Sequence, residues 1–275
     1  MNRLVFSILL TAILTACNFK HEPVTLTILH TNDTHSQVEP RQTDNRGGYA
    51  RRMGIISKER EADKDLILLD AGDFWQGTPY FNYYKGEVEI EAMNRMQYDA
   101  VTLGNHEFDN GVRLLAEQLE KAQFPVLCAN YNTEDSPLQQ IVKPYTVIKR
   151  KGLNIGIIGI GVKPHSLIAS DNFYPLQWVH PYAVADSLAR ELREKKHCDV
   201  VILLSHLGTQ PSETNPNSIC DINLAKQTSG IDLIIGGHSH RIENLIVSNK
   251  QGKPVLLTQA GKSGINIGKV ILKVK

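Results

Sequence analysis

The sequence predicts an α/β fold, and two features carry that prediction. Short, almost wholly apolar runs, typical of buried strands, alternate with longer segments in which apolar residues recur at helical spacing. Five of the apolar runs end directly in a polar segment that contains histidine, aspartate or asparagine. Polar segments at strand ends are where α/β folds place binding and catalytic groups. We therefore expect a site at the ends of the strands.

Strands and helices are expected to alternate over the first half of the chain. The opening strand alternates β-branched and apolar residues, and each later strand is a shorter apolar run. The predicted strands are 24–30, 66–69, 99–103 and 124–129, and the predicted helices are 47–63, 87–97 and 112–122.

The second half begins with a predicted β-hairpin around Lys151-Gly152. Pro181 stands where the first turn of a helix favours proline. The predicted strands are 145–150, 153–160, 200–204, 231–235, 253–259 and 267–273, and the predicted helices are 181–196 and a short one ending at Gly230.

Four aromatic residues lie close together in the predicted loop after the second strand. They are Tyr80, Phe81, Tyr83 and Tyr84. Such a group either packs within its loop or offers a surface on which a base can stack. We expect packing, with base stacking as the alternative.

The charge balance argues against a nucleic acid partner. The chain has 30 lysines and arginines against 29 aspartates and glutamates, a formal net charge of +1. Nucleic-acid binding relies on a basic field, which this chain lacks. A site that handles phosphate would need its positive charge locally, and a metal ion is the obvious source.

The first residues are typical of a targeting segment. Arg3 precedes an apolar run, 4–14, that is too short to anchor stably across a bilayer. The following Leu14-Thr15-Ala16-Cys17 resembles the lipobox of bacterial lipoproteins, with an ordinary signal peptide as the alternative. We predict a lipoprotein signal peptide at 1–16, a linker at 17–23 lipidated on Cys17, and a catalytic domain at 24–275. The domain is then extracytoplasmic and membrane-anchored, in the periplasm or at the cell surface.

The three remaining cysteines lack the spacing of a metal site. They are Cys128, Cys198 and Cys220, and an odd number argues against a disulfide framework. Small core residues are the expected use. A single disulfide between Cys198 and either of the others stays open.

The polar groups at the five strand ends form a candidate metal site. They are Asp33/His35, Asp73, Asn105/His106, His206 and His238/His240. Each alone has an ordinary explanation, such as a helix cap or a hydrogen-bonded histidine. Together, with His106 set aside, they supply two carboxylates, one amide oxygen and four imidazoles at strand ends that converge on one edge of a sheet.

Seven ligands are too many for one ion, which needs about three or four. Two ions about 3.5–4 Å apart, bridged by a carboxylate, would use them all. Nitrogen and oxygen ligands without thiolate suit Zn, Mn, Fe or Co. His238 and His240 would point to opposite sides of an extended backbone, so a turn must redirect them.

The same residues carry a family resemblance over about 25–273. In order, they are Asp33-x-His35, Gly72-Asp73, Gly104-Asn105-His106-Glu107, His206 and Gly237-His238-x-His240. This series resembles the motifs of the calcineurin-like metallophosphoesterases. Two longer motifs narrow the resemblance to the bacterial 5'-nucleotidase, UDP-sugar hydrolase and cyclic phosphodiesterase branch. They are Leu29-His30-Thr31-Asn32-Asp33 and Glu107-Phe108-Asp109-x-Gly111.

The resemblance implies two packed β-sheets with helices outside, a four-layer α/β/β/α sandwich. It implies that one ion is held by Asp33, His35 and His240, the other by Asn105, His206 and His238, and that Asp73 bridges them. His106 and Asp109 match the catalytic dyad. The implied nucleophile is a hydroxide bridging the metals.

Family nucleotidases continue into a C-terminal domain that grips the nucleotide, and this chain ends at Lys275 without that motif set. The expected function is di-metal phosphoester hydrolysis, 5'-nucleotidase-like, on extracytoplasmic nucleotides. The alternatives are a subunit that needs a separately encoded C-terminal-type partner, a cyclic-nucleotide phosphodiesterase, and a thiosulfohydrolase-like sulfur-ester hydrolase. Retention of both His106 and Asp109 argues against a merely metal-binding subunit.

Overall fold

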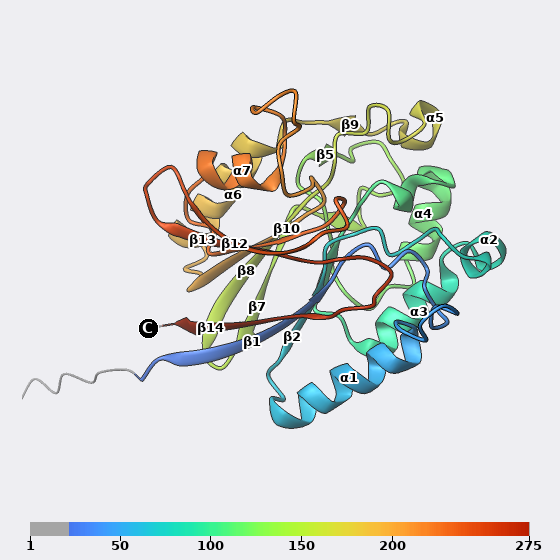
Figure 1. Cartoon of the computed structure of the whole chain (residues 1–275). Coiled ribbons are helices and arrows are strands. Elements are labelled where there is room, and N and C mark those ends of the chain that lie inside the picture. Colours follow the sequence, from blue (N-terminus) through green and yellow to red (C-terminus); the bar gives the residue numbers. More distant parts are fainter. Residues whose placement is uncertain (1–21, 275) are drawn as a thin grey trace, which may run out of the picture.

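Two six-stranded β-sheets lie face to face, and helices cover their outer faces (Figure 1). The computed structural model describes residues 22–274, so the predicted signal peptide and Cys17 lie outside the described part. The arrangement confirms the predicted four-layer α/β/β/α sandwich. Within 22–274, no helix is both long and apolar enough to cross a bilayer.

The first sheet is parallel except at one edge. Its strands, in order, are β14 (Gly268–Val274), β1 (Val24–Thr31), β2 (Ile67–Asp70), β3 (Ala100–Thr102), β4 (Val126–Leu127) and β6 (Val142–Lys143). Only the edge strand β14 pairs antiparallel with its neighbour, β1.

The second sheet has a parallel centre and antiparallel edges. Its strands, in order, are β12 (Ile242–Ser248), β13 (Pro254–Ala260), β11 (Leu233–Gly236), β10 (Val200–Ser205), β8 (Leu153–Ile160) and β7 (Tyr145–Arg150). The predicted hairpin is confirmed as β7 and β8. A small ribbon pairs β5 (Tyr131–Asn132) with β9 (Gln177–Trp178).

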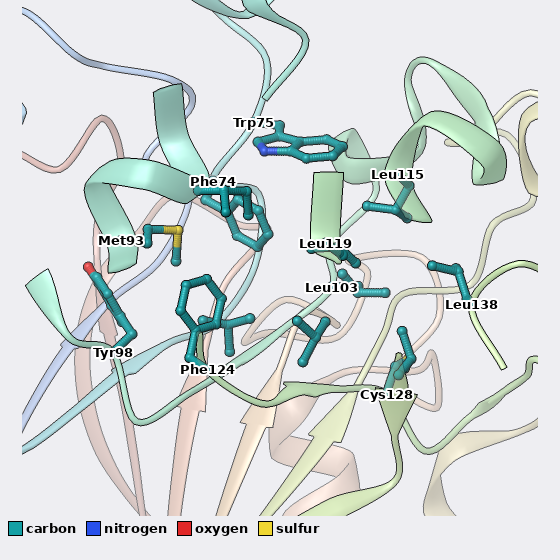
Figure 2. Packing of buried hydrophobic residues seen from close by; sticks show 14 of the residues in the cluster. Phe74, Trp75, Met93, Tyr98, Leu103, Leu115, Leu119, Phe124, Cys128 and Leu138 are labelled. Atoms are coloured by element: carbon teal, nitrogen blue, oxygen red, sulfur yellow. The ribbon is translucent and has the colours of Figure 1, made fainter. Parts of the chain in front are cut away.

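Helices form the two outer layers. The first sheet is covered by α1 (Tyr49–Ala62), α2 (Pro79–Tyr84), α3 (Glu87–Met96) and α4 (Gly111–Leu119), and the second by α6 (Pro181–Glu194) and α7 (Asp221–Gln227). Figure 2 shows part of the first outer layer, where Phe74, Trp75 and Leu115 are among the buried side chains. The short η1 (His106–Phe108) and α5 (Ser170–Phe173) complete the elements.

The central strands are buried on both faces, which explains their continuous apolar runs. All six residues of β10 are buried. Val201 and Leu203 pack under α6 and α7, whereas Ile202 and Leu204 belong to the apolar layer between the sheets. Period-2 alternation therefore directs one half of each strand to a helical layer and the other half to the opposite sheet.

The aromatic segment is a helix, so the predicted loop is wrong. Pro79 starts α2, and Lys85 ends it in the left-handed conformation. Phe81 is buried, as packing requires, whereas Tyr83 is 81% exposed and Tyr84 54% exposed. The three cysteines at 128, 198 and 220 are buried and free, so neither disulfide forms.

His30 joins the two sheets and is expected to make stability depend on pH. Its ring is fully buried, and its Nε2 lies 3.2 Å from Oγ1 of Thr258 in β13. Burial lowers the pKa of His30 from 6.5 to about 4. The unfolded chain therefore binds more protons than the folded chain as pH falls from 6.5 to 4, and stability drops over that window.

We expect this drop to be about 3 kcal/mol larger in the wild type than in His30→Leu, since leucine does not titrate. Denaturant unfolding between pH 7 and pH 4 measures it. His165→Leu, at an exposed histidine, is the control and should keep the wild-type slope. Equal slopes in the wild type and His30→Leu would contradict the assignment.

Candidate metal centre

Five loops from the two sheets meet at one end of the fold. Three follow β1, β2 and β3 of the first sheet, and two follow β10 and β11 of the second. Backbone hydrogen bonds tie the first two loops together, from Asp33 N to the Gly72 carbonyl at 2.9 Å and from His35 N to the Asp73 carbonyl at 3.0 Å. Side chains that are distant in sequence thereby share one small volume.

The backbone is in the left-handed conformation at five of the seven predicted metal ligands. The φ angles are 48° at Asp33, 46° at His35, 55° at Asp73, 70° at His238 and 57° at His240. Residues other than glycine rarely adopt positive φ, and such strained positions gather at functional sites. The turn expected between the last two histidines is present, and it directs both imidazoles inward.

One cluster consists of Asp33, His35 and His240, whose ligand atoms lie within 4.8 Å of one another. His35 Nε2 is 3.0 Å from His240 Nε2, which is 3.3 Å from Asp33 Oδ1. Asp33 is fully buried, while His240 reaches the surface.

A second cluster consists of Asp73, His206 and His238. His206 Nε2 lies 3.0 Å from Asp73 Oδ2, although no hydrogen bond of ordinary geometry joins the two atoms. His238 Nδ1 lies 3.1 Å from Asn105 Oδ1, so the amide oxygen belongs to this side of the site. Asp73 also falls within 4.8 Å of His35 and His106, and this shared position is what a bridging ligand requires.

The tautomer of His206 suits a metal ligand. Its Nδ1 is 2.6 Å from the Ala71 carbonyl, to which it donates a hydrogen bond. Nε2 then faces the carboxylates of the centre, and it has no hydrogen-bond partner although the residue is fully buried. A buried imidazole fixed through one nitrogen and free at the other is the usual arrangement of a metal-ligating histidine.

The charged side chains at the centre favour the binding of a cation. Burial alone would raise the pKa of Asp73, but the imidazoles of His206 and His106 outweigh it and hold that pKa well below its usual range. Burial alone would lower the pKa of His206, but the carboxylates of Asp73 and Asp33 raise it to about 10. Burial lowers the pKa of His238 to about 4. Two buried carboxylates therefore attract positive charge to this point.

The donor set fits two divalent metal ions. Seven nitrogen and oxygen donors are present without a thiolate, and an unpartnered imidazole nitrogen points into the centre. Such donors suit Zn, Mn, Fe or Co, and the number suits two ions rather than one.

His106 and Asp109 form a pair beside the centre. His106 Nδ1 is 2.9 Å from Asp109 Oδ2, and both side chains are about one-third exposed. The hydrogen bond to Asp109 raises the pKa of His106, against the lowering effect of partial burial. The imidazole is thus oriented through one nitrogen, while the other remains available.

Glu107 organises two of the ligand loops, and sequence reasoning missed it. Its buried carboxylate accepts backbone N–H hydrogen bonds from Asp73 at 3.0 Å, Trp75 at 3.2 Å and Gly104 at 2.6 Å. A Cβ on Gly104 would lie 2.2 Å from Asp73 Oδ1, so only glycine fits there. The sole signal in the sequence was the position of Glu107 directly after His106.

A pocket with a cavity volume of about 360 Å³ opens over this centre. Three imidazoles line it, from His35, His106 and His240. Gln37, Gln76 and Lys262 contribute to the rim, with Gly77 and Ser263. This size suits a small phosphoester in contact with the donors.

Comparisons with known proteins show similarity to phosphoesterases. A family model described as calcineurin-like phosphoesterase matches residues 26–241. The chain is 35% identical over 235 residues to the snake venom 5'-nucleotidase of Naja atra, which covers 78% of this chain and 41% of that enzyme.

Solved structures show the same relationship. The 5'-nucleotidase precursor of Thermus thermophilus superposes with a TM-score of 0.80 at 34% identity, over 90% of this chain and 51% of that one. A sulfate thiohydrolase of Thermus thermophilus superposes with a TM-score of 0.74 at 16% identity, over 90% of this chain and 56% of the other, which shows a shared fold alone. The chain thus spans about half the length of these solved relatives.

Proposed function

This chain belongs to the calcineurin-like phosphoesterase family, and we propose that it releases phosphate from extracytoplasmic nucleoside 5'-phosphates. It is a phosphoester hydrolase homologous to 5'-nucleotidases, and its donor clusters suit divalent metal ions. The nucleotide specificity rests on relatives that this chain matches over part of their length.

The observation that carries the proposal is the convergence of the donors beside the dyad. Asp33, His35 and His240 would hold one ion, and Asn105, His206 and His238 the other, with Asp73 between them. What supports this division is the grouping of ligand atoms within 4.8 Å and the contact between His238 and Asn105. His106 is assigned to catalysis because, unlike the buried His206, it is partly exposed in the pocket and is paired with Asp109.

When bound, two divalent ions would neutralise charge on the phosphoryl oxygens and lower the pKa of the attacking water. Residues of the chain orient the imidazole and supply the proton. Asp109 accepts the Nδ1–H of His106 and fixes the ring, so that the protonated imidazole can stabilise charge on the phosphoryl group or give its Nε2 proton to the leaving oxygen. Asp33 and Asp73 are buried beneath the pocket, where their charge is little screened by water.

The predicted location belongs to the proposal. Leu14-Thr15-Ala16-Cys17 supports a lipid anchor at Cys17 that holds the domain on a membrane outside the cytoplasm. The relative from Naja atra is by its name a venom protein. The substrate would then be an extracellular or periplasmic nucleotide.

Recognition of the nucleobase is proposed to need a further protein segment. Of the residues in the described part that line the pocket, none carries a benzene or indole ring on which a base could stack. A separately encoded partner that resembles the C-terminal domain of the family would supply that surface. The sulfur-ester alternative has less support, since the thiohydrolase shares the fold alone.

Elemental analysis and a substrate panel test the proposal together. The chain supplied with Mn or Zn should carry two transition-metal ions, because seven donors exceed the needs of one. It should hydrolyse p-nitrophenyl phosphate and AMP, and chelation should abolish both activities. A metal content that stays at or below one ion per chain would rule out the dinuclear centre. Hydrolysis of sulfur esters without phosphoesters would favour the alternative.

A further inference from the structure

A short loop after β13 presents a lysine beside the pocket. Gly261, Ser263 and Gly264 have φ angles of 85°, 57° and 56°, so the loop is a tight left-handed turn. Asn32 Nδ2 donates to the Gly261 carbonyl at 2.7 Å, and Ser263 N donates to the Asp33 carbonyl at 2.7 Å. The backbone on both sides of Lys262 is thereby tied to the loop that carries Asp33.

Among the described residues that line the pocket, Lys262 alone carries a permanent positive charge. The other lining residues are imidazoles, amides, glycine and serine, and no carboxylate is among them. Its side chain is exposed, and no ion pair involves it within the part of the chain that the structure describes. The ammonium is therefore available to an anion that enters the pocket.

We propose that Lys262 is a specificity-determining residue whose ammonium contacts the phosphoryl group and favours dianionic phosphomonoesters over monoanionic phosphodiesters. The inference rests on the proposed function. A monoester at neutral pH carries one more negative charge than a diester, and that charge lies on an oxygen that a fixed cation can bind. A charge-assisted contact that only the monoester makes in full raises its kcat/KM selectively.

The test compares Lys262→Met with Lys262→Arg in the full chain loaded with Mn. Methionine keeps the length of the side chain and removes its charge, whereas arginine keeps the charge. Lys253→Met, at an exposed lysine on a different face, is the matched control. The substrates are p-nitrophenyl phosphate and bis(p-nitrophenyl) phosphate, and metal content is measured for each variant.

We expect Lys262→Met to lower kcat/KM for the monoester roughly tenfold and that for the diester at most about twofold. Lys262→Arg should restore most of the loss, Lys253→Met should change neither value, and all variants should keep the wild-type metal content. Unchanged monoester hydrolysis in Lys262→Met, or an equal fall for both esters, would overturn the inference alone. A wild type that hydrolyses neither ester would overturn the proposed function and this inference with it.

Discussion

Replacing His106 by alanine is expected to lower kcat roughly 10²–10⁴-fold while the metal content stays near the wild-type value. The imidazole is held by Asp109 at 2.9 Å, and its pKa is raised by that hydrogen bond, so it is poised to carry a proton. Its removal leaves the metal donors of both clusters in place. Steady-state kinetics with p-nitrophenyl phosphate, together with elemental analysis, measures both quantities.

The metal content of the variant distinguishes a catalytic role for His106 from a role as a metal ligand. Both roles are considered because a ring nitrogen of His106 lies within 4.8 Å of the ligand atoms of His35 and Asp73. A variant that loses metal in parallel with rate would make His106 a ligand and refute its assignment to the dyad. Asp109→Asn serves as the companion variant. Combining it with His106→Ala should lower the rate little further, since Asp109 acts through the imidazole.

Asp73→Asn is expected to be the most damaging single change among the proposed ligands. The residue belongs to the cluster with His206 and His238 and also lies within 4.8 Å of His35 in the other cluster, so its charge helps to attract cations on both sides of the site. Asparagine can still accept the hydrogen bond from His106 N, now 2.9 Å from Asp73 Oδ1, so the loop should fold. The loss of charge should reduce metal content and activity by more than the about 10–100-fold typical of an outer-shell change.

Glu107→Gln is the matched control for that variant, because it also replaces one buried carboxyl group near the same loops by an amide. Glu107 contacts backbone N–H groups rather than metal donors, so a fall within about 10–100-fold is expected. An Asp73→Asn variant that retains two ions, or one that is milder than Glu107→Gln, would show that Asp73 does not bridge.

Local patterns were sufficient for most of the fold. The fully apolar run at 200–204 became β10, whose residues are all buried, and Pro181 starts α6 as its position indicates. These predictions are confirmed because a strand buried on both faces requires a continuous apolar run, and because the fixed φ of proline suits the first turn of a helix. Both features are visible in the local sequence.

Two other elements were not predicted from the local sequence. The segment 79–84 forms α2, in which Tyr80, Tyr83 and Tyr84 share one helical face, but the residue that anchors the helix to the core is the buried Phe81. The edge strand β12 escaped prediction because three of its residues, at 242, 244 and 246, are exposed, although the strand pairs in register with β13. Tertiary context decided both.

The sequence by itself identified the residues that we propose supply the chemistry. Asp33, Asp73 and His206 follow buried strands, and their positions can be assigned from local pattern alone. The family follows from that series of motifs, and the comparisons confirm it.

Only the tertiary structure decided that these residues meet across two sheets rather than along one edge of a single sheet. That meeting depends on the apolar layer in which Leu69 of β2 and Leu204 of β10 belong to one cluster, 135 positions apart in the chain. The tertiary structure also determines the role of Glu107, because three backbone N–H groups converge on its side chain only when both loops are folded. Burial and backbone convergence are long-range properties, so no local pattern of residues encodes them.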